Sequence, residues 1–249
     1  MHPDAYHVQK EVISAWERLR VSMQKMYQST DVRPGAGHDI FKLNARAPDD
    51  EVKLDIGPIV FNVPERAGRG HNLYVVVRGW LSFGDGNLRE LPLKTRAFFT
   101  EVAYFRLKGN VLQHVYGVHY DLDEKLPGHP VFHGQLSSRM DLAPSVRDHY
   151  RVEDQPQEMF TPLLRNIRIP TAQMDVFSTV VQICADHLVF EGADQNVHEA
   201  FAEARSINSF FQGAAHRMPF LNEMPAIACY RSIHWYTRAP QDSPAAPGK

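Results

Sequence analysis

Cysteine is scarce in this sequence: Cys184 and Cys229 are the only two in 249 residues. Both lie among apolar neighbours, which is typical of buried, reduced thiols rather than of a disulfide framework. The scarcity excludes the class of small, disulfide-stabilised secreted domains. We expect a protein of a reducing compartment, without a disulfide bond.

Long hydrophobic runs are absent as well. No stretch approaches the roughly 18 apolar residues that a membrane-spanning helix needs. No basic and apolar leader opens the chain either. We therefore expect a cytoplasmic protein without a membrane partner.

Neither sign of charge predominates, because 27 Lys and Arg residues face 29 Asp and Glu residues, a formal net charge of −2. A chain so nearly neutral exerts no long-range attraction on nucleic acid or on an anionic membrane. The balance excludes a protein that binds polyanions over its whole surface, although it is compatible with a local basic groove.

The common catalytic motifs are missing too. The sequence has no P-loop, Rossmann glycine pattern, nucleophile elbow, His-Glu-x-x-His motif or zinc-ribbon spacing. Glycines do occur in the segment DVRPGAGHD, but no Gly-Lys-Ser or Gly-Lys-Thr follows them. A function must therefore be inferred from the arrangement of individual side chains.

The remaining composition is that of an ordinary globular protein, with 43% hydrophobic and 22% charged residues. A chain of this length buries about 70 to 75% of its unfolded surface when it folds. No linker divides it, so we expect one domain over residues 1–238. Residues 239–249, APQDSPAAPGK, have the composition of a disordered tail.

Hydrophobic periodicity predicts three kinds of element. Residues 1–30 repeat apolar side chains, such as Val8, Val12 and Trp16, at helical steps. Over residues 51–137 the period falls to two, with glycine-rich bends, which predicts an antiparallel meander of about five strands. Residues 171–213 predict a helical pair, with Thr171 as the first cap. We expect an α+β fold in which the N-terminal helix is followed by the sheet, and the C-terminal helical pair packs on one face of that sheet.

The stretch richest in reactive side chains is residues 111–136, where we expect a β-hairpin. Four of the 13 histidines lie in it. Alternation places His119 and Asp121 on one face of the first arm, and His129, His133 and Gln135 on the matching face of the second arm. This polar face is the candidate site.

The expected hairpin register is a further prediction. It joins three pairs: His119 with His133, Asp121 with Val131, and Asp123 with His129. By the same alternation, His114 belongs to the opposite, apolar face, where we expect a core residue.

Two facing histidines can act as a general base and a general acid, because imidazole titrates near neutral pH. A neighbouring aspartate would stabilise one imidazolium, and Gln135 would donate to a developing oxyanion. This arrangement is typical of a small hydrolytic or phosphodiester-cleaving enzyme, such as an RNA-acting effector. Its partner would be a nucleic acid or a nucleotide.

Two other hypotheses are left open. A divalent metal would find ligands in His119, Asp121 and His133, and the segment 119–121 resembles the His-x-Asp of the nonhaem iron oxygenases over those three residues alone. Alternatively, the hairpin residues only pack, and the chain is a noncatalytic interaction subunit of a multi-component bacterial-type system. In that case the partner is another protein, and a homodimer is also compatible with the sequence.

An anion site outside the hairpin is a separate prediction. Arg165 and Arg168 flank a strand-like segment that leads to the expected cap at Thr171. A phosphate there would meet two guanidinium groups and a helix N-terminus. Ordinary surface charge is the alternative explanation of the same residues.

Overall fold

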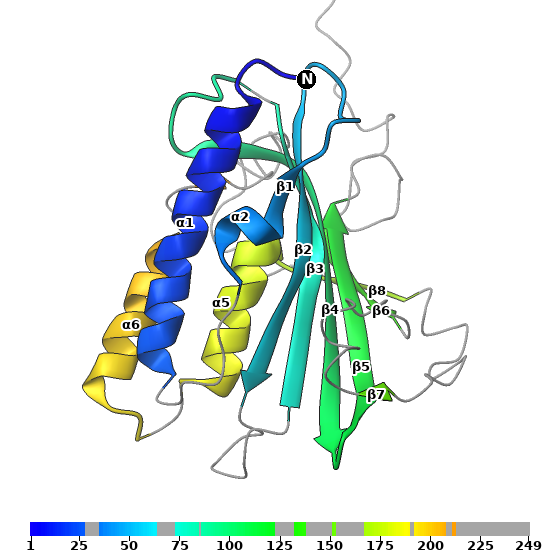
Figure 1. Ribbon diagram of the computed structural model, residues 1–249, viewed down its shortest axis with the longest axis vertical. Coiled ribbons are helices and arrows are strands. Elements are labelled where there is room, and N and C mark those ends of the chain that lie inside the picture. Colours follow the sequence, from blue (N-terminus) through cyan, green and yellow to red (C-terminus); the bar gives the residue numbers. More distant parts are fainter. Residues whose placement is uncertain are drawn as a thin grey trace, which may run out of the picture.

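A computed structural model describes residues 1–27, 35–63, 73–84, 86–122, 132–137, 151–152, 167–189, 192–207 and 211–212. Within these ranges, one antiparallel sheet carries helices on one of its faces (Figure 1). This arrangement confirms the predicted α+β fold. The predicted tail at 239–249 lies outside the described residues.

The main path of the sheet has seven strands in the order β1-β2-β3-β4-β5-β6-β8, and every neighbouring pair is antiparallel. The strands are β1 Phe41–Leu43, β2 Val52–Val63, β3 Leu73–Phe83, β4 Leu93–Lys108, β5 Val111–Leu122, β6 Phe132–Ser137 and β8 Arg168–Pro170. Two short strands, β7 Arg151–Val152 and β9 Phe211–Gln212, pair parallel with β5 and β4. The sequence predicted about five strands because three-residue strands show no periodicity.

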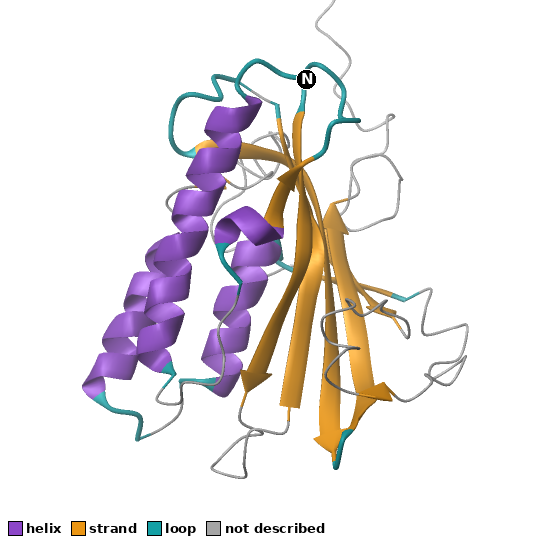
Figure 2. Cartoon of the chain, in the orientation of Figure 1, coloured by secondary structure: helices purple, strands orange, loops and turns teal. Residues whose placement is uncertain are grey.

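Helices α1 (Ala5–Met26), α5 (Val176–His187) and α6 (Gln195–Ser206) lie on the same side of the sheet, with the short α2 (Gly37–Ile40) beside them (Figure 2). The predicted cap at Thr171 is wrong. The carboxylate of Asp175 accepts the amides of Phe177 and Ser178, each at 3.0 Å, and so sets the start of α5. The second helix of the pair ends at Ser206, earlier than predicted, and residues 211–212 are strand.

None of the helices in the described part of the chain combines the length and the apolarity that crossing a membrane requires.

An aromatic cluster in the core joins α1, β1 and α5. The Trp16 and Phe41 rings meet edge to face with centroids 5.7 Å apart, and Phe41 stacks on Phe177 at 5.8 Å. All three side chains are fully buried, and the Trp16 indole donates to the Gly35 carbonyl at 3.0 Å. Cys184, also buried here, is a free thiol whose pKa burial raises to about 12, so it stays protonated.

A β-bulge in β5 reverses the facing of its first half. Tyr104 pairs with Tyr116 and Phe105 pairs with His114, which leaves Val115 as the extra residue. His114 therefore lies on the side of the sheet away from the helices, beside Phe105, with ring centroids 5.2 Å apart. The prediction that His114 occupies the face opposite to His119 is wrong for this reason.

Gly79 of β3 lies close against the backbone of β4. Its φ is 157°, and a Cβ built there would collide with the Phe99 carbonyl oxygen. We expect Gly79→Ala to lower the free energy of unfolding by about 3 kcal/mol or more, because the two strands must separate. Gly57→Ala is the control, since its Cβ would find the nearest atom at 3.5 Å. Urea denaturation of both variants tests this, and equal stabilities would contradict it.

Candidate functional site

A row of polar side chains crosses five strands on the face away from the helices. Arg78 of β3 pairs with Glu101 of β4, and Glu101 pairs with His119 of β5. The row continues from His119 to Gln135 of β6 and from Gln135 to Arg168 of β8. Cross-strand partners share a face, so these side chains lie next to one another.

A second row runs parallel to the first, at a distance of two residues on each strand. It joins Trp80, Phe99, Asp121 and His133 in adjacent strands. The two rows bring four of the predicted site residues together: His119, Asp121, His133 and Gln135. The fifth, His129, lies outside the described residues.

The hairpin register differs from the predicted one by two residues. His119 faces Gln135, and Asp121 faces His133. A shift of two keeps every side chain on its face, so the alternation pattern is the same in both registers. The correction matters chemically, because it places the carboxylate, instead of the second imidazole, directly opposite a histidine.

Asp121 and His133 form a close pair in the site. Nε2 of His133 lies 3.0 Å from Oδ1 of Asp121, and the side chains are 3% and 31% exposed. The contact is within ion-pair distance, but its angles are not those of a hydrogen bond to Oδ1. The nearly buried imidazole thus directs one ring nitrogen at a partly exposed carboxylate.

His119 has a different environment. Its ring stacks on Phe99 with centroids 5.5 Å apart, and its side chain is hydrogen-bonded with Gln135. Burial lowers the pKa of His119, while the charges of Asp121 and Glu101 and the bond with Gln135 oppose this shift. The net direction is downward, so His119 is mainly neutral at pH 7.

The Gln135 bond also orients the His119 ring. It favours the protonated imidazole and so opposes the effect of burial on the pKa of His119. A neutral imidazole has one N–H donor and one acceptor nitrogen, so only one of its two nitrogens can take a proton.

Arg78 and Glu101 belong to the site but were not predicted from the sequence. The Arg78 guanidinium meets Oε2 of Glu101 at 2.6 Å through both Nε and a terminal nitrogen. The Glu101 side chain is 11% exposed, so loss of this partner would leave a nearly buried carboxylate without a counter-charge. One signal was available: Arg78 is the sole charged residue in the apolar run LYVVVRGWLSF.

The predicted anion site is only partly described. Arg168 lies at the end of the first row, next to Gln135, and Arg165 lies outside the described residues. The backbone amide of Thr171 donates to the Phe132 carbonyl at 3.1 Å, while the first-turn amides of α5 are taken by Asp175. The Arg168 guanidinium is therefore the part of this prediction that adjoins the histidines.

Metal binding gains no support from the described ranges. Among those residues, no group of three His, Cys, Asp or Glu side chains is arranged to hold a metal ion. Asp121 and His133 are close together, whereas His119 turns to Gln135. The divalent-metal hypothesis stays untested.

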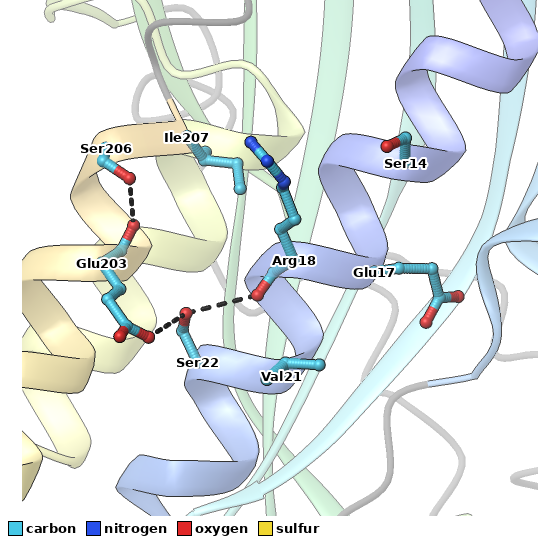
Figure 3. A pocket seen from close by; sticks show the side chains of 8 residues that line it. All are labelled: Ser14, Glu17, Arg18, Val21, Ser22, Glu203, Ser206 and Ile207. Atoms are coloured by element: carbon cyan, nitrogen blue, oxygen red, sulfur yellow. Dashed lines mark hydrogen bonds between the residues drawn. The ribbon is translucent and has the colours of Figure 1, made fainter.

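A groove of about 660 Å³ lies elsewhere, between α1 and α6 (Figure 3). Ser22 bridges its two walls, because its hydroxyl contacts the Arg18 carbonyl at 3.2 Å and the Glu203 carboxylate at 3.3 Å. Ser206 and Ile207 close one end. The lining contains no histidine, so this groove lacks a side chain that normally titrates near neutral pH.

Known proteins give no further guidance. Comparisons with protein families, with curated proteins and with solved structures found no match. The function must therefore be argued from the chemistry of the two polar rows.

Removing Arg78 should expose the dependence of Glu101 on its partner. We expect Arg78→Ala to lower the free energy of unfolding by about 1–3 kcal/mol, because a largely buried carboxylate loses its counter-charge. Adding Glu101→Gln should recover part of that loss. As a control, Lys25→Ala breaks an exposed pair with Glu203 and should cost less than about 1 kcal/mol. Chemical denaturation measures all four proteins, and an Arg78→Ala variant as stable as Lys25→Ala would contradict the argument.

Proposed function

We propose that the protein is a hydrolytic enzyme of the phosphodiester-cleaving class, with His119 as general base and His133 as general acid. The observation that carries the proposal is the contrast between two imidazoles on one face of adjacent strands. His119 is kept neutral by burial, whereas His133 has a carboxylate 3.0 Å away. Acid–base catalysis at a single pH requires two groups in different protonation states, and these two imidazoles have different neighbours to favour that.

The proposed reaction assigns each group one role. His119 takes the proton of the attacking hydroxyl or water as the new phosphorus–oxygen bond forms. His133 gives its proton to the leaving oxygen as the old bond breaks, and Asp121 stabilises its imidazolium beforehand. Gln135 holds the His119 ring through its carbonyl, and its amide group donates to the developing oxyanion. The two histidines then exchange protonation states, and solvent restores them.

A second candidate function is noncatalytic protein binding. The groove between α1 and α6 supports it, because its volume is about 660 Å³ and it lies in the helical layer, whereas the histidine rows lie on the other face of the sheet. In that case the polar rows serve to hold the sheet together. Substitution of the histidines distinguishes the two functions.

We expect His119→Ala and His133→Ala each to reduce the rate of cleavage of a chromogenic phosphodiester by at least about 100-fold, because each removes one proton-transfer step. His198→Ala, an exposed site on α6, is the matched control and should retain full activity. Circular dichroism and thermal unfolding establish that the variants fold. Full activity in either of the first two variants would eliminate the two-histidine mechanism.

The pH dependence provides a second test. Because the pKa of His119 lies below its ordinary value of 6.5, the acid limb of the kcat/KM profile should have a midpoint below 6.5. The charge of Glu101 raises the pKa of His119, so Glu101→Gln should move this midpoint to still lower pH. Glu203→Gln, on α6, should leave it unchanged. A midpoint above 6.5, or no movement with Glu101→Gln, would contradict the assignment of His119 as the base.

A further inference from the structure

Two aromatic side chains extend the row that contains Asp121 and His133. Trp80 pairs with Phe99, and Phe99 pairs with Asp121. Both rings are half-buried, so each shows part of its surface on the face that carries the imidazoles. The acid–base groups thus adjoin flat aromatic surface on β3 and β4.

A cation lies over the first of these rings. Nζ of Lys53 is 3.9 Å from the centroid of the Trp80 ring. Lys53 forms no ion pair with a carboxylate in the described part of the chain, and the carboxylate of nearby Asp55 accepts instead from Asn44, at 2.9 and 3.1 Å. The N–H groups of the Lys53 ammonium can therefore donate to an oxygen of a bound molecule.

The charges on this face are nearly balanced. Its strand-paired residues include four cations and three carboxylates: Lys42, Lys53, Arg78 and Arg168, with Asp55, Glu101 and Asp121. A nucleic-acid chain is held through many phosphates, and its binding surfaces carry an excess of Lys and Arg. This face is suited to a smaller anion with one or two phosphates.

The spacing of the rows sets a length for the ligand. Neighbouring strands lie about 4.8 Å apart, so Trp80 on β3 is separated from Asp121 on β5 by about 10 Å. One nucleoside monophosphate spans such a distance, with the base at one end and the phosphate at the other.

We infer that Trp80, Phe99 and Lys53 form a base-binding subsite, and that the substrate is a phosphate ester of a single nucleoside rather than a nucleic-acid chain. The inference rests on the proposed function. The base takes the place of the ammonium on the Trp80 ring, and Lys53 then pairs with an oxygen at the edge of the base. The phosphate lies between His119 and His133.

Calorimetric titration with uridine 5′-monophosphate and with ribose 5-phosphate tests the subsite without turnover. The wild-type protein should bind the nucleotide at least about fivefold more tightly than the sugar phosphate, since stacking of one base contributes about 1–3 kcal/mol. Trp80→Ala and Trp80→Leu should lose this preference, and Trp80→Phe should keep most of it. Affinity for ribose 5-phosphate should not change. Tyr6→Ala, which removes an exposed aromatic side chain from α1, is the control and should bind like wild type.

Three results would overturn the inference. The first is equal wild-type affinity for the nucleotide and the sugar phosphate. The second is unchanged nucleotide binding in Trp80→Leu, which retains apolar bulk and guards against a folding defect in Trp80→Ala. The third is an RNA dodecamer that binds far more tightly than the mononucleotide, with an affinity that falls steeply with salt.

The base-binding subsite and the proposed hydrolytic function can be tested separately. Nucleotide binding that depends on Trp80, in a protein that cleaves no phosphodiester, would remove the hydrolytic proposal and keep the subsite. Cleavage of a dialkyl phosphate that needs both histidines, without any preference for the nucleotide, would keep the hydrolase and remove the subsite.

Discussion

Burial of one face of the sheet against the helices is the constraint on which the other features depend. Side chains alternate along a strand, so each residue that fills the core obliges its neighbours to occupy the opposite face. Val102 packs in the core from β4 and turns Glu101 away from the helices. Val118 packs against the same core and does the same for His119. The polar rows are therefore a consequence of how the apolar residues pack.

The side chains on the outer face of the sheet are only partly exposed to solvent, and this determines the chemistry of that face. A half-buried polar side chain needs a partner, and each main member of the rows has a different one: a guanidinium for Glu101, a carboxylate for His133, an amide for His119. Two imidazoles on adjacent strands thereby acquire unlike electrostatic surroundings. The difference arises from neighbours on adjacent strands, so it depends on register rather than on composition.

The sequence predicted which hairpin residues share a face, because a period of two is unaffected by the length of the bend. It did not predict which residues stand opposite each other, since the polar bend after Leu122 carries no turn signature that selects one register. Arg78 and Glu101 were missed for a related reason. They lie 23 residues apart on different strands, and only the pairing of β3 with β4 brings them together. Thr171 and Asp175 can both cap a helix, and they lie close together in the sequence. Which of them becomes the cap depends on where the helix packs, and the sequence alone does not show this.

The bulge at Val115 has a consequence for how this site tolerates change in chain length. Elsewhere in β5, inserting or deleting one residue would rotate every following side chain to the wrong side of the sheet. A bulge already holds one residue outside the pairing, so a deletion there restores a regular ladder and leaves His119 and Asp121 facing as before. His114 and its neighbours toward the start of the strand already pair in step with β4, so they would keep their faces too. β5 therefore tolerates a change of length at Val115, whereas the segment that carries His119 and Asp121 must keep its length. The histidine rows use residues of that second segment only.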